Sequence, residues 1–297
     1  MLIRNFTFPG EEPAFQQLFD RIRSETGAKS GTWALPFSPL QGTGDAGRLA
    51  VQAGRAAGYG WIRKQTGKRA LVEIDALAGD KTAVFGPLLE ACRALALEWE
   101  VRRLVAYVSG VDEILTGAYR NAGFDPRGSV HELRMDLSGE RPPSAVPDGY
   151  FLKPFHEFRH LPTLAATLHR AYHDKFSRPE YETDGVTVDT VRAEIEAHPE
   201  AEIERDYFTM LNFLGKGVAV VRSRGHDWID GPGVVPEERE NGLHLPLLTA
   251  AMQHLESRGS RAVRLMAFDD DPSRIDEYRR IGFDLEATKT CWQMKIS

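Results

Sequence analysis

The stretch DWIDGPGVVPEERENGLHLPLLTAAMQHL, residues 227–255, is the part of the sequence that decides the fold. It opens with a short apolar strand that is interrupted by Gly-Pro-Gly at 231–233, and a polar turn follows at 237–242. A helix is predicted next, because apolar residues recur at helical spacing: Leu243, Leu247, Leu248, Ala251, Met252 and Leu255. A strand that delivers a turn into a helix N-terminus favours an anion site, since free backbone N–H groups and the helix dipole point at the ligand.

Composition and charge limit the classes of function. The 297 residues suffice for two domains of about 150 residues each, and no apolar run approaches the roughly 18 residues of a membrane span. The net charge of −6 argues against a nucleic-acid partner. Cys92 and Cys291 lack metal-ligand spacing, and the first residues lack the apolar core of a signal peptide. We therefore expect a cytoplasmic protein without a membrane or nucleic-acid partner, and a homodimer stays open.

The sequence repeats itself at a fixed spacing. Residues 119–124, Tyr-Arg-Asn-Ala-Gly-Phe, recur 159 residues later as Tyr-Arg-Arg-Ile-Gly-Phe at 278–283. Pro-Leu-Leu at 87–89 recurs at 246–248 with the same spacing. Separate matches that agree on one spacing indicate an internal duplication.

Each half of the sequence predicts the same order of elements: a strand, one or more helices, three strands, and then helix, strand, helix, strand. This order predicts two α/β domains, each with a mixed, mostly antiparallel sheet flanked by helices. The Pro-rich segment ERPPSAVPDG at 140–149 is the predicted linker. The domains are therefore expected at 1–139 and 150–297.

The turn of the opening stretch resembles the acyl-CoA loop of the GNAT superfamily of N-acyltransferases. That loop has Arg or Gln, two residues, Gly, one residue and then Gly or Ala, shortly after Val-x-Pro, and Arg239 and Gly242 match it. Residues 278–283 resemble the family's Tyr-x-x-x-Gly-Phe segment. The element order is also similar to that of a GNAT domain, so the whole chain resembles a tandem pair of such domains.

The resemblance implies a cofactor site and a catalytic residue. Acetyl-CoA is the implied co-substrate, and no metal is implied. The residues implied to hold the acyl-CoA are Val234, Val235, Arg239, Glu240, Asn241, Gly242 and His244. A backbone N–H near Val234 or Val235 would face the thioester oxygen, as an oxyanion donor must. Tyr278 would protonate the departing thiolate.

Some residues depart from the family pattern. His244 stands where the family has Gly or Ala, and its side chain would crowd a position where close backbone approach is wanted. The loop also carries glutamates at 237, 238 and 240, whose charges would weaken pyrophosphate binding. In the first half, Asp80 and Ala83 stand at the repeat positions of the matching loop residues. We therefore expect the first domain to be non-catalytic and the second to hold the acyl-CoA site.

Two further motifs suggest other chemistry. His-Glu-Phe-Arg-His at 156–160 matches the HExxH pattern of zinc hydrolases. Pro162 follows so closely that solvated or capping histidines are the simpler explanation. The aspartates at 269–271 could hold an ammonium group, although a helix cap and a solvated turn explain them more simply.

The sequence thus predicts an N-acetyltransferase that moves an acyl group, acetyl in the first instance, from acyl-CoA to a primary amine. The amine belongs to a small molecule or a peptide, and it attacks directly in a ternary complex. The alternative is a GNAT-fold protein without catalysis that binds a ligand or a partner, and a zinc hydrolase is the third hypothesis. The acceptor, the acyl length and the general base stay open.

Overall fold

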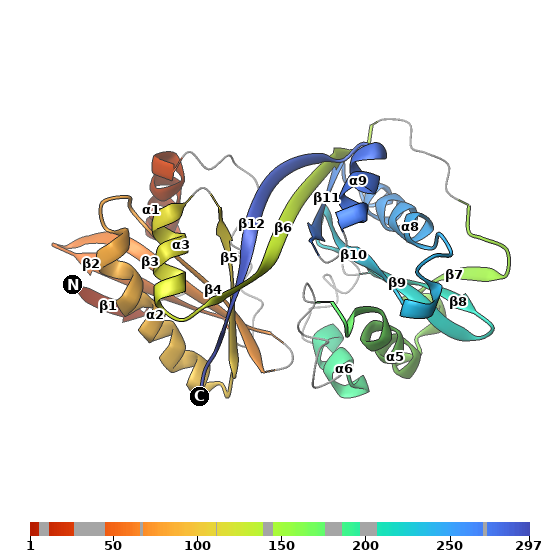
Figure 1. Cartoon of the computed structure of the whole chain (residues 1–297), viewed down its shortest axis with the longest axis horizontal. Coiled ribbons are helices and arrows are strands. Elements are labelled where there is room, and N and C mark those ends of the chain that lie inside the picture. The colour runs from red at the N-terminus through yellow and green to blue at the C-terminus, as the bar shows by residue number, and fades with distance from the viewer. Residues whose placement is uncertain are drawn as a thin grey trace. The chain divides into compact units, whose positions relative to one another are not determined.

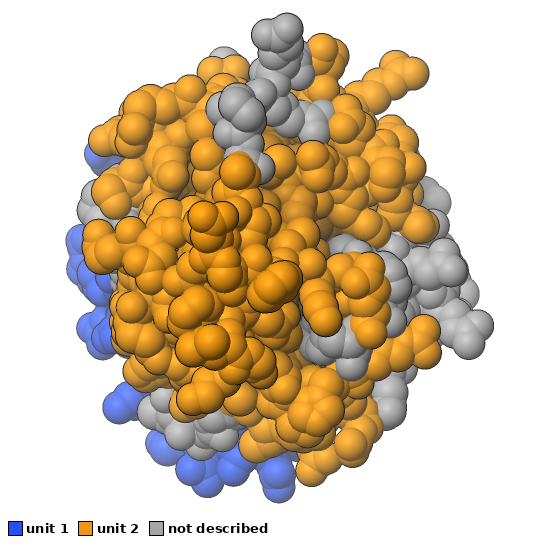
Figure 2. Space-filling view, turned by 90° about the vertical axis from the view of Figure 1, so that its right-hand side faces the viewer, with its two compact units in different colours: residues 1–129, 288–297 blue, residues 130–287 orange. Residues whose placement is uncertain are grey.

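The computed structural model describes residues 1–5, 12–26, 45–65, 68–110, 112–138, 145–175, 186–196, 207–269 and 272–297. They form two compact units, which Figure 2 shows in separate colours. Unit 1 comprises residues 1–129 and 288–297, and unit 2 comprises residues 130–287. No helix in these described ranges has the length and apolar character of a membrane span.

Unit 1 is a mixed sheet with helices on both faces (Figure 1). Its strand order is β1 (Leu2–Asn5), β2 (Asp45–Gln52), β3 (Arg55–Gln65), β4 (Arg69–Ala76), β5 (Arg103–Ser109) and β12 (Asp284–Lys295). Neighbouring strands run antiparallel, except that β4 and β5 run parallel. Leu49 packs with helix α1 (Glu12–Thr26), whereas Ala50 packs with α2 (Lys81–Glu98) and α3 (Glu113–Asn121). Consecutive strand residues point to opposite faces, so both faces are covered.

Unit 2 has the same plan. Its strand order is β6 (Asp125–Asp136), β11 (Ala262–Phe268), β10 (Trp228–Val234), β9 (Lys216–Arg224), β8 (Tyr207–Phe213) and β7 (Tyr150–Pro154). Neighbouring strands run antiparallel, except that β10 and β11 run parallel. Its helices are α4 (Phe155–Phe158), α5 (Leu161–Tyr172), α6 (Val188–Glu196), α8 (His244–Ser257) and α9 (Pro272–Arg280), with a short 3₁₀ turn η2 (Pro236–Glu238). Met210 packs with α5 and α6, and the next residue, Leu211, packs with α8, so this sheet is also covered on both faces.

The structure confirms the predicted duplication and the mixed α/β fold. Helices α3 and α9 start 159 residues apart, at residues 113 and 272. Strands β5 and β11 keep the same spacing, with starts at 103 and 262. Strands β6 and β12 are both 12 residues long and are again 159 residues apart.

The repeated Tyr-x-x-x-Gly-Phe segment is the C-terminal cap of these helices. In α3, the Phe124 N–H donates to the Tyr119 carbonyl at 3.1 Å, and Gly123 has a φ of 90°. In α9, the Phe283 N–H donates to the Tyr278 carbonyl at 3.0 Å. This is the Schellman pattern, in which a glycine takes the left-handed conformation and the flanking apolar residues meet. The cap therefore fixes both tyrosines, whatever else they do.

The last strand of each repeat completes the sheet of the other unit. Residues 289–295 of β12 lie opposite residues 103–109 of β5, and β12 contributes the buried Trp292 to the core of unit 1. Residues 130–136 of β6 lie opposite residues 262–268 of β11 in unit 2.

This exchange divides the chain differently from the predicted ranges 1–139 and 150–297, because residues 130–139 fall in unit 2 and 288–297 fall in unit 1. Part of the predicted linker, residues 140–144, lies outside the described residues. The two strands are equivalent members of a repeat, so each has the pattern to complete either sheet, as in domain swapping. The order of elements along the sequence therefore does not reveal the exchange.

Two core substitutions test the exchange by their location. Trp292→Ala removes a side chain that is 2% exposed in the core of unit 1, and we expect a loss of about 3–5 kcal/mol of stability. Leu133→Ala removes a fully buried side chain from the core of unit 2, with an expected loss of about 2–5 kcal/mol.

Amide hydrogen exchange measures which unit loses protection. Trp292→Ala should unprotect β5 and leave β9 protected, and Leu133→Ala should do the reverse. The opposite pattern, in which Trp292→Ala loosens β9 of unit 2 and Leu133→Ala loosens β5 of unit 1, would contradict the exchange.

Candidate active site

The candidate active site lies in unit 2, where β10 parts from β11. The two strands pair in parallel at residues 228–229, opposite residues 264–265. Beyond this point β10 continues beside β9, and its register shifts between Asp230 and Gly233. A β-bulge of this kind bends the strand that carries it, so the sheet opens between β10 and β11.

Gly-Pro-Gly at 231–233 accounts for the bulge. Pro232 has no N–H and cannot donate to a strand ladder. A Cβ at Gly233 would lie 2.3 Å from the Tyr172 ring, so no larger residue fits there without a shift. The Tyr172 hydroxyl donates to the Gly231 carbonyl at 2.7 Å, which ties α5 to the bulge.

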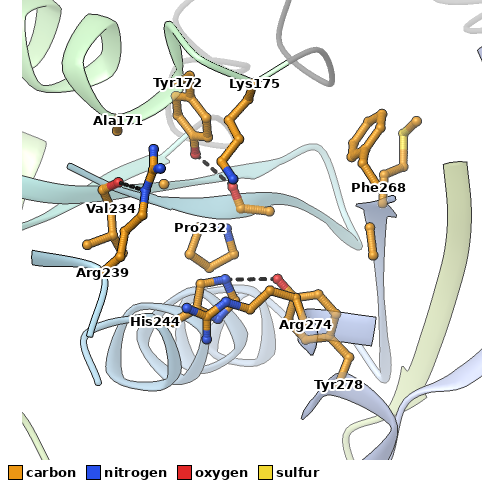
Figure 3. Close-up of a pocket in the computed structure, with 14 residues that line it drawn as sticks. Ala171, Tyr172, Lys175, Pro232, Val234, Arg239, His244, Phe268, Arg274 and Tyr278 are labelled. Atoms are coloured by element: carbon orange, nitrogen blue, oxygen red, sulfur yellow. Dashed lines mark hydrogen bonds between the residues drawn. The ribbon is translucent and has the colours of Figure 1, made fainter. Parts of the chain in front are cut away.

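A pocket occupies the opening (Figure 3). Its enclosed part has a volume of about 70 Å³, and the rest of the opening is continuous with solvent. The predicted site residues that line it are Val234, Arg239, His244 and Tyr278. Figure 3 shows Tyr172 on one side of Pro232 and the His244–Tyr278 pair on the other.

The two valines of the strand end have different roles. The Val235 N–H donates to the Val218 carbonyl of β9 at 2.9 Å, so it cannot face a thioester in the pocket. Val234 lies opposite Ala219 in the same antiparallel register. Hydrogen-bonded and non-hydrogen-bonded pairs alternate in such a ladder, so Val234 directs its N–H and C=O away from β9. The Val234 carbonyl indeed accepts a hydrogen bond from Arg239 Nε at 3.3 Å.

The guanidinium of Arg239 is held by a carboxylate. Its two terminal nitrogens bond the two oxygens of Asp174, each at 2.7 Å, and Asp174 lies two residues after the end of α5. These hydrogen bonds from Arg239 lower the pKa of Asp174. Any anion that uses Arg239 must therefore compete with Asp174.

The glutamates of the turn point away from the pocket. Glu237 pairs with Arg170 of α5. Glu238 accepts hydrogen bonds from the Tyr150 hydroxyl and from Asn241 Nδ2, both at 2.6 Å. Glu240 is exposed. Among the described residues, no glutamate lines the pocket. The repulsion between these glutamates and a pyrophosphate, which the sequence predicted, is therefore reduced.

Of the remaining predicted loop residues, Asn241 thus serves the turn itself. Gly242 is exposed and has a φ of 66°, a left-handed conformation that favours glycine. Both residues position the start of α8 and lie outside the pocket lining.

His244, which the sequence comparison treated as an obstruction, is part of the site. It is the first residue of α8 and is 5% exposed. Its Nε2 lies 3.0 Å from the hydroxyl oxygen of Tyr278, a residue that is 3% exposed. Burial, and then the positive charges of Arg274 and Lys175, hold the pKa of His244 well below its usual value. The imidazole is therefore neutral at physiological pH.

The Tyr278 hydroxyl reaches the bulge. A Cβ built on Gly231 would lie 3.9 Å from that hydroxyl. Tyr172 and Tyr278 thus approach Gly231 from α5 and α9. The pocket therefore combines a backbone donor at Val234, a phenol and a neutral imidazole.

Unit 1 differs in its described residues at the repeat position of this site. β4 pairs with β3 without a register shift, so it carries no bulge. Lys81, which is 4% exposed, lies 3.4 Å from Asp75 and bonds Asp112. This ion-paired cluster lies at the start of α2, whereas the start of α8 in unit 2 lies beside the pocket.

The zinc motif is divided between two helices. Helix α4 ends at Phe158, and Arg159 takes a left-handed φ of 41°. His160 then caps α5 and accepts a hydrogen bond from the Thr163 N–H. The first motif histidine thus belongs to α4 and the second caps α5. No group of three or more metal-ligating side chains converges in the described part of the chain.

The acidic segment 269–271 is described only at Asp269, which lies 2.9 Å from Nε2 of His131. Asp270 and Asp271 lie outside the described residues. The pocket residues that sequence reasoning missed are Tyr172, Lys175 and Arg274. Their only sequence signal is position: two follow or end a helix and one lies in the first turn of another.

Comparison with known proteins supports the fold. No family model matches the chain. A mycothiol acetyltransferase of Pseudarthrobacter chlorophenolicus is 25% identical over 209 residues, which are 65% of this chain and 59% of that protein. The chain thus matches about three fifths of the length of this curated relative.

Solved structures match over nearly the whole chain. A GCN5-related N-acetyltransferase from Sphaerobacter thermophilus has a TM-score of 0.74 at 17% identity and covers 99% of this chain and 95% of its own. A tandem GNAT protein from the clavulanic acid biosynthesis pathway has a TM-score of 0.63 at 16% identity, with 99% and 98% covered. The chain therefore has the tandem GNAT fold.

The depressed pKa of His244 predicts how stability varies with pH. An exposed imidazole in the unfolded chain takes up a proton below about pH 6.5, whereas the folded protein keeps His244 neutral. The unfolded state then binds more protons, so His244 lowers the free energy of unfolding as the pH falls below that value.

Thermal midpoints of the wild type and His244→Phe, measured at pH 7.5, 6.5 and 5.5, test this linkage. The variant should lose less stability between pH 6.5 and 5.5 than the wild type. Equal losses would show that His244 titrates normally in the folded protein.

Proposed function

We propose that the chain is an acyl-CoA-dependent N-acetyltransferase whose active site is the pocket of unit 2. Acetyl-CoA is the co-substrate, and the acceptor is a primary amine of a small molecule or peptide. The observation that carries this proposal is the opening between β10 and β11, where an outward Val234 N–H and the Tyr278 hydroxyl share one pocket. Cys92 and Cys291 are buried and form no disulfide, which accords with action in the cytoplasm.

Binding of the nucleotide end would use charge and the start of α8. Arg239, Arg274 and Lys175 are the cations of the pocket lining, and the helix N-terminus adds backbone N–H groups and a partial positive charge. These groups suit a pyrophosphate. The pantetheine arm would lie along the open side of Val234, in place of a neighbouring strand.

The reaction would be direct attack of the amine on the thioester carbon. The Val234 N–H would stabilise the oxyanion that forms on the former carbonyl oxygen. The C–S bond then breaks, the proton that the amine loses ends on the thiol, and the products are an amide and CoA. Tyr278 would deliver that proton to the sulfur. No covalent intermediate on the protein is needed, because the amine would attack the thioester directly in the same opening.

Unit 1 would serve as scaffold. The buried Lys81 cluster occupies the place where a pyrophosphate would approach α2, and β4 keeps its ladder with β3. The proposal therefore assigns one active site to each chain.

An alternative function is ligand binding without catalysis. The Arg239–Asp174 pair favours it, since the bidentate contact already satisfies the guanidinium. In this case the pocket would bind a ligand, and no thioester would be cleaved.

Calorimetric titration of acetyl-CoA into the purified protein tests the cofactor site. The wild type should bind at micromolar strength, and Arg239→Glu should weaken binding at least about tenfold, which corresponds to about 1.4 kcal/mol. Arg192→Glu on the exposed face of α6 is the matched control, because it makes the same charge change away from the pocket. The control should bind as the wild type does.

A turnover assay separates the enzyme from the binding protein. Release of CoA would be followed with an aminoglycoside, a polyamine, an amino acid amide, a tripeptide and an amino-sugar thiol as acceptors. Binding without turnover of any of these would favour the alternative function. Absence of binding at millimolar acetyl-CoA would contradict both the cofactor and the reaction.

Asp174→Asn tests whether Arg239 takes part in binding. The change removes the carboxylate that competes for the guanidinium, so the dissociation constant for acetyl-CoA should fall about fivefold, or about 1 kcal/mol. An unchanged or weaker affinity in the same calorimetric titration would show that Arg239 stays out of the ligand's reach.

A further inference from the structure

A buried imidazole lies directly behind the proposed acid of the reaction. His244 Nε2 is 3.0 Å from the Tyr278 hydroxyl, and the two rings lie 5.4 Å apart. His244 Nδ1 is buried without a hydrogen bond and lies 3.8 Å from Glu277 Oε2. The three side chains thus form a row in the order Tyr278, His244, Glu277.

The carboxylate selects the tautomer of the neutral imidazole. With a proton on Nδ1, the N–H dipole points toward the Glu277 oxygen and is attracted to it. With the proton on Nε2, a lone pair would face the same oxygen at that distance and be repelled. The Nδ1–H tautomer is therefore the stable one, and Nε2 accepts a hydrogen bond from the Tyr278 hydroxyl.

We propose that His244 is the proton store of the active site and allows the single hydroxyl of Tyr278 to act first as base and then as acid. This inference rests on the proposed function and deepens it, because it names the route of the proton from the amine. His244 acts through Tyr278 and is a positioning residue. Glu277 orients it and stabilises the transient imidazolium.

The proton balance is complete within the row. When the amine adds to the thioester carbon, the Tyr278 oxygen takes a proton from the attacking nitrogen and passes its own proton to His244 Nε2. When the C–S bond breaks, Tyr278 gives a proton to the sulfur and regains one from His244. The amine has then lost one proton, the thiol has gained one, and all three side chains are back in their starting states.

The charged groups around His244 keep its imidazole neutral between turnovers. The groups that face His244 are Arg274, Glu277 and Tyr278 from α9 and Lys175 from the segment after α5. The two cations disfavour an imidazolium, so His244 is neutral at rest and readily returns a proton that it has accepted. Arg274 bonds Glu277 at 2.6 Å, which fixes the carboxylate beside Nδ1.

Unit 1 shows that the fold does not need this histidine. Phe85 stands 159 residues before His244 and packs edge-on against Tyr119 at 4.8 Å between ring centres. An aromatic ring at this position therefore supports the tyrosine by packing alone. His244→Phe reproduces the unit 1 pair and should fold.

Nitrogen-15 NMR of the ligand-free protein, labelled at histidine, tests the tautomer without any substrate. His244→Phe assigns the signal. At pH 7 the wild type should show a protonated Nδ1 and an unprotonated Nε2. A protonated Nε2 would overturn the proposal, because Tyr278 would then have no acceptor for its proton.

Kinetics with acetyl-CoA and the best amine of the acceptor panel test the proton transfer. His244→Phe and His244→Gln should each lower kcat about 100-fold or more, with the KM for acetyl-CoA within threefold of the wild type. Glutamine can hydrogen-bond Tyr278 but cannot store a proton. Recovery of kcat to within threefold by His244→Gln would reduce His244 to a packing and orienting role and overturn the proposal.

The two arms separate this proposal from the proposed function. If no amine is turned over, the acetyltransferase assignment fails. The NMR experiment still tests the row of Tyr278, His244 and Glu277, and a protonated Nε2 would contradict it. If turnover is found and His244→Gln is fully active, the proposed function is supported, and the role of His244 as a proton store is rejected.

Discussion

The departure of β10 from β11 at Gly231 is the constraint on which the site depends. A strand that paired on both sides would spend its N–H and C=O groups on its neighbours. Pro232 cannot donate, and Gly233 leaves no space between β10 and the Tyr172 ring for a larger residue. Val234 is thereby left with backbone groups that face the opening, and Tyr172 anchors the carbonyl of Gly231 beside it. The pocket exists because residues 231–233 of β10 do not continue the pairing with β11.

The two units show what the same fold does with and without that segment. In unit 1, β4 keeps its register and the start of α2 is filled by Lys81 with two carboxylates. In unit 2, the start of α8 carries a neutral histidine beside a pocket lined by cations. The Tyr-x-x-x-Gly-Phe cap is common to both, so a buried tyrosine at this place is a product of helix capping. Its chemistry depends on the neighbour: Phe85 in one unit and His244 in the other.

The sequence predicted features that are local or periodic. The 159-residue spacing, the helix after residue 243 and the glycine caps depend on neighbours along the chain, and they yielded the duplicated α/β fold. Partners far apart in sequence could not be predicted. Asp174 binds Arg239 across 65 positions, and Tyr172 reaches Gly231 across 59. His244 was interpreted as an obstruction because its partner, Tyr278, lies 34 positions away. The Val235 N–H is excluded as the oxyanion donor because it donates to the Val218 carbonyl of the neighbouring strand. No sequence motif reveals this strand register.

The exchange of β6 and β12 between the two units has a consequence for folding during synthesis. During synthesis, β6 emerges long before β11, whereas β5 must wait for β12, which follows all other described strands. Unit 1 therefore spends the translation of more than half the chain with an open strand edge, a surface that attracts unwanted pairing. The exchange also makes each unit depend on a strand from the other repeat. Excision of either repeat would remove the strand that completes the remaining sheet, and that sheet would then have to pair with the last strand of its own repeat.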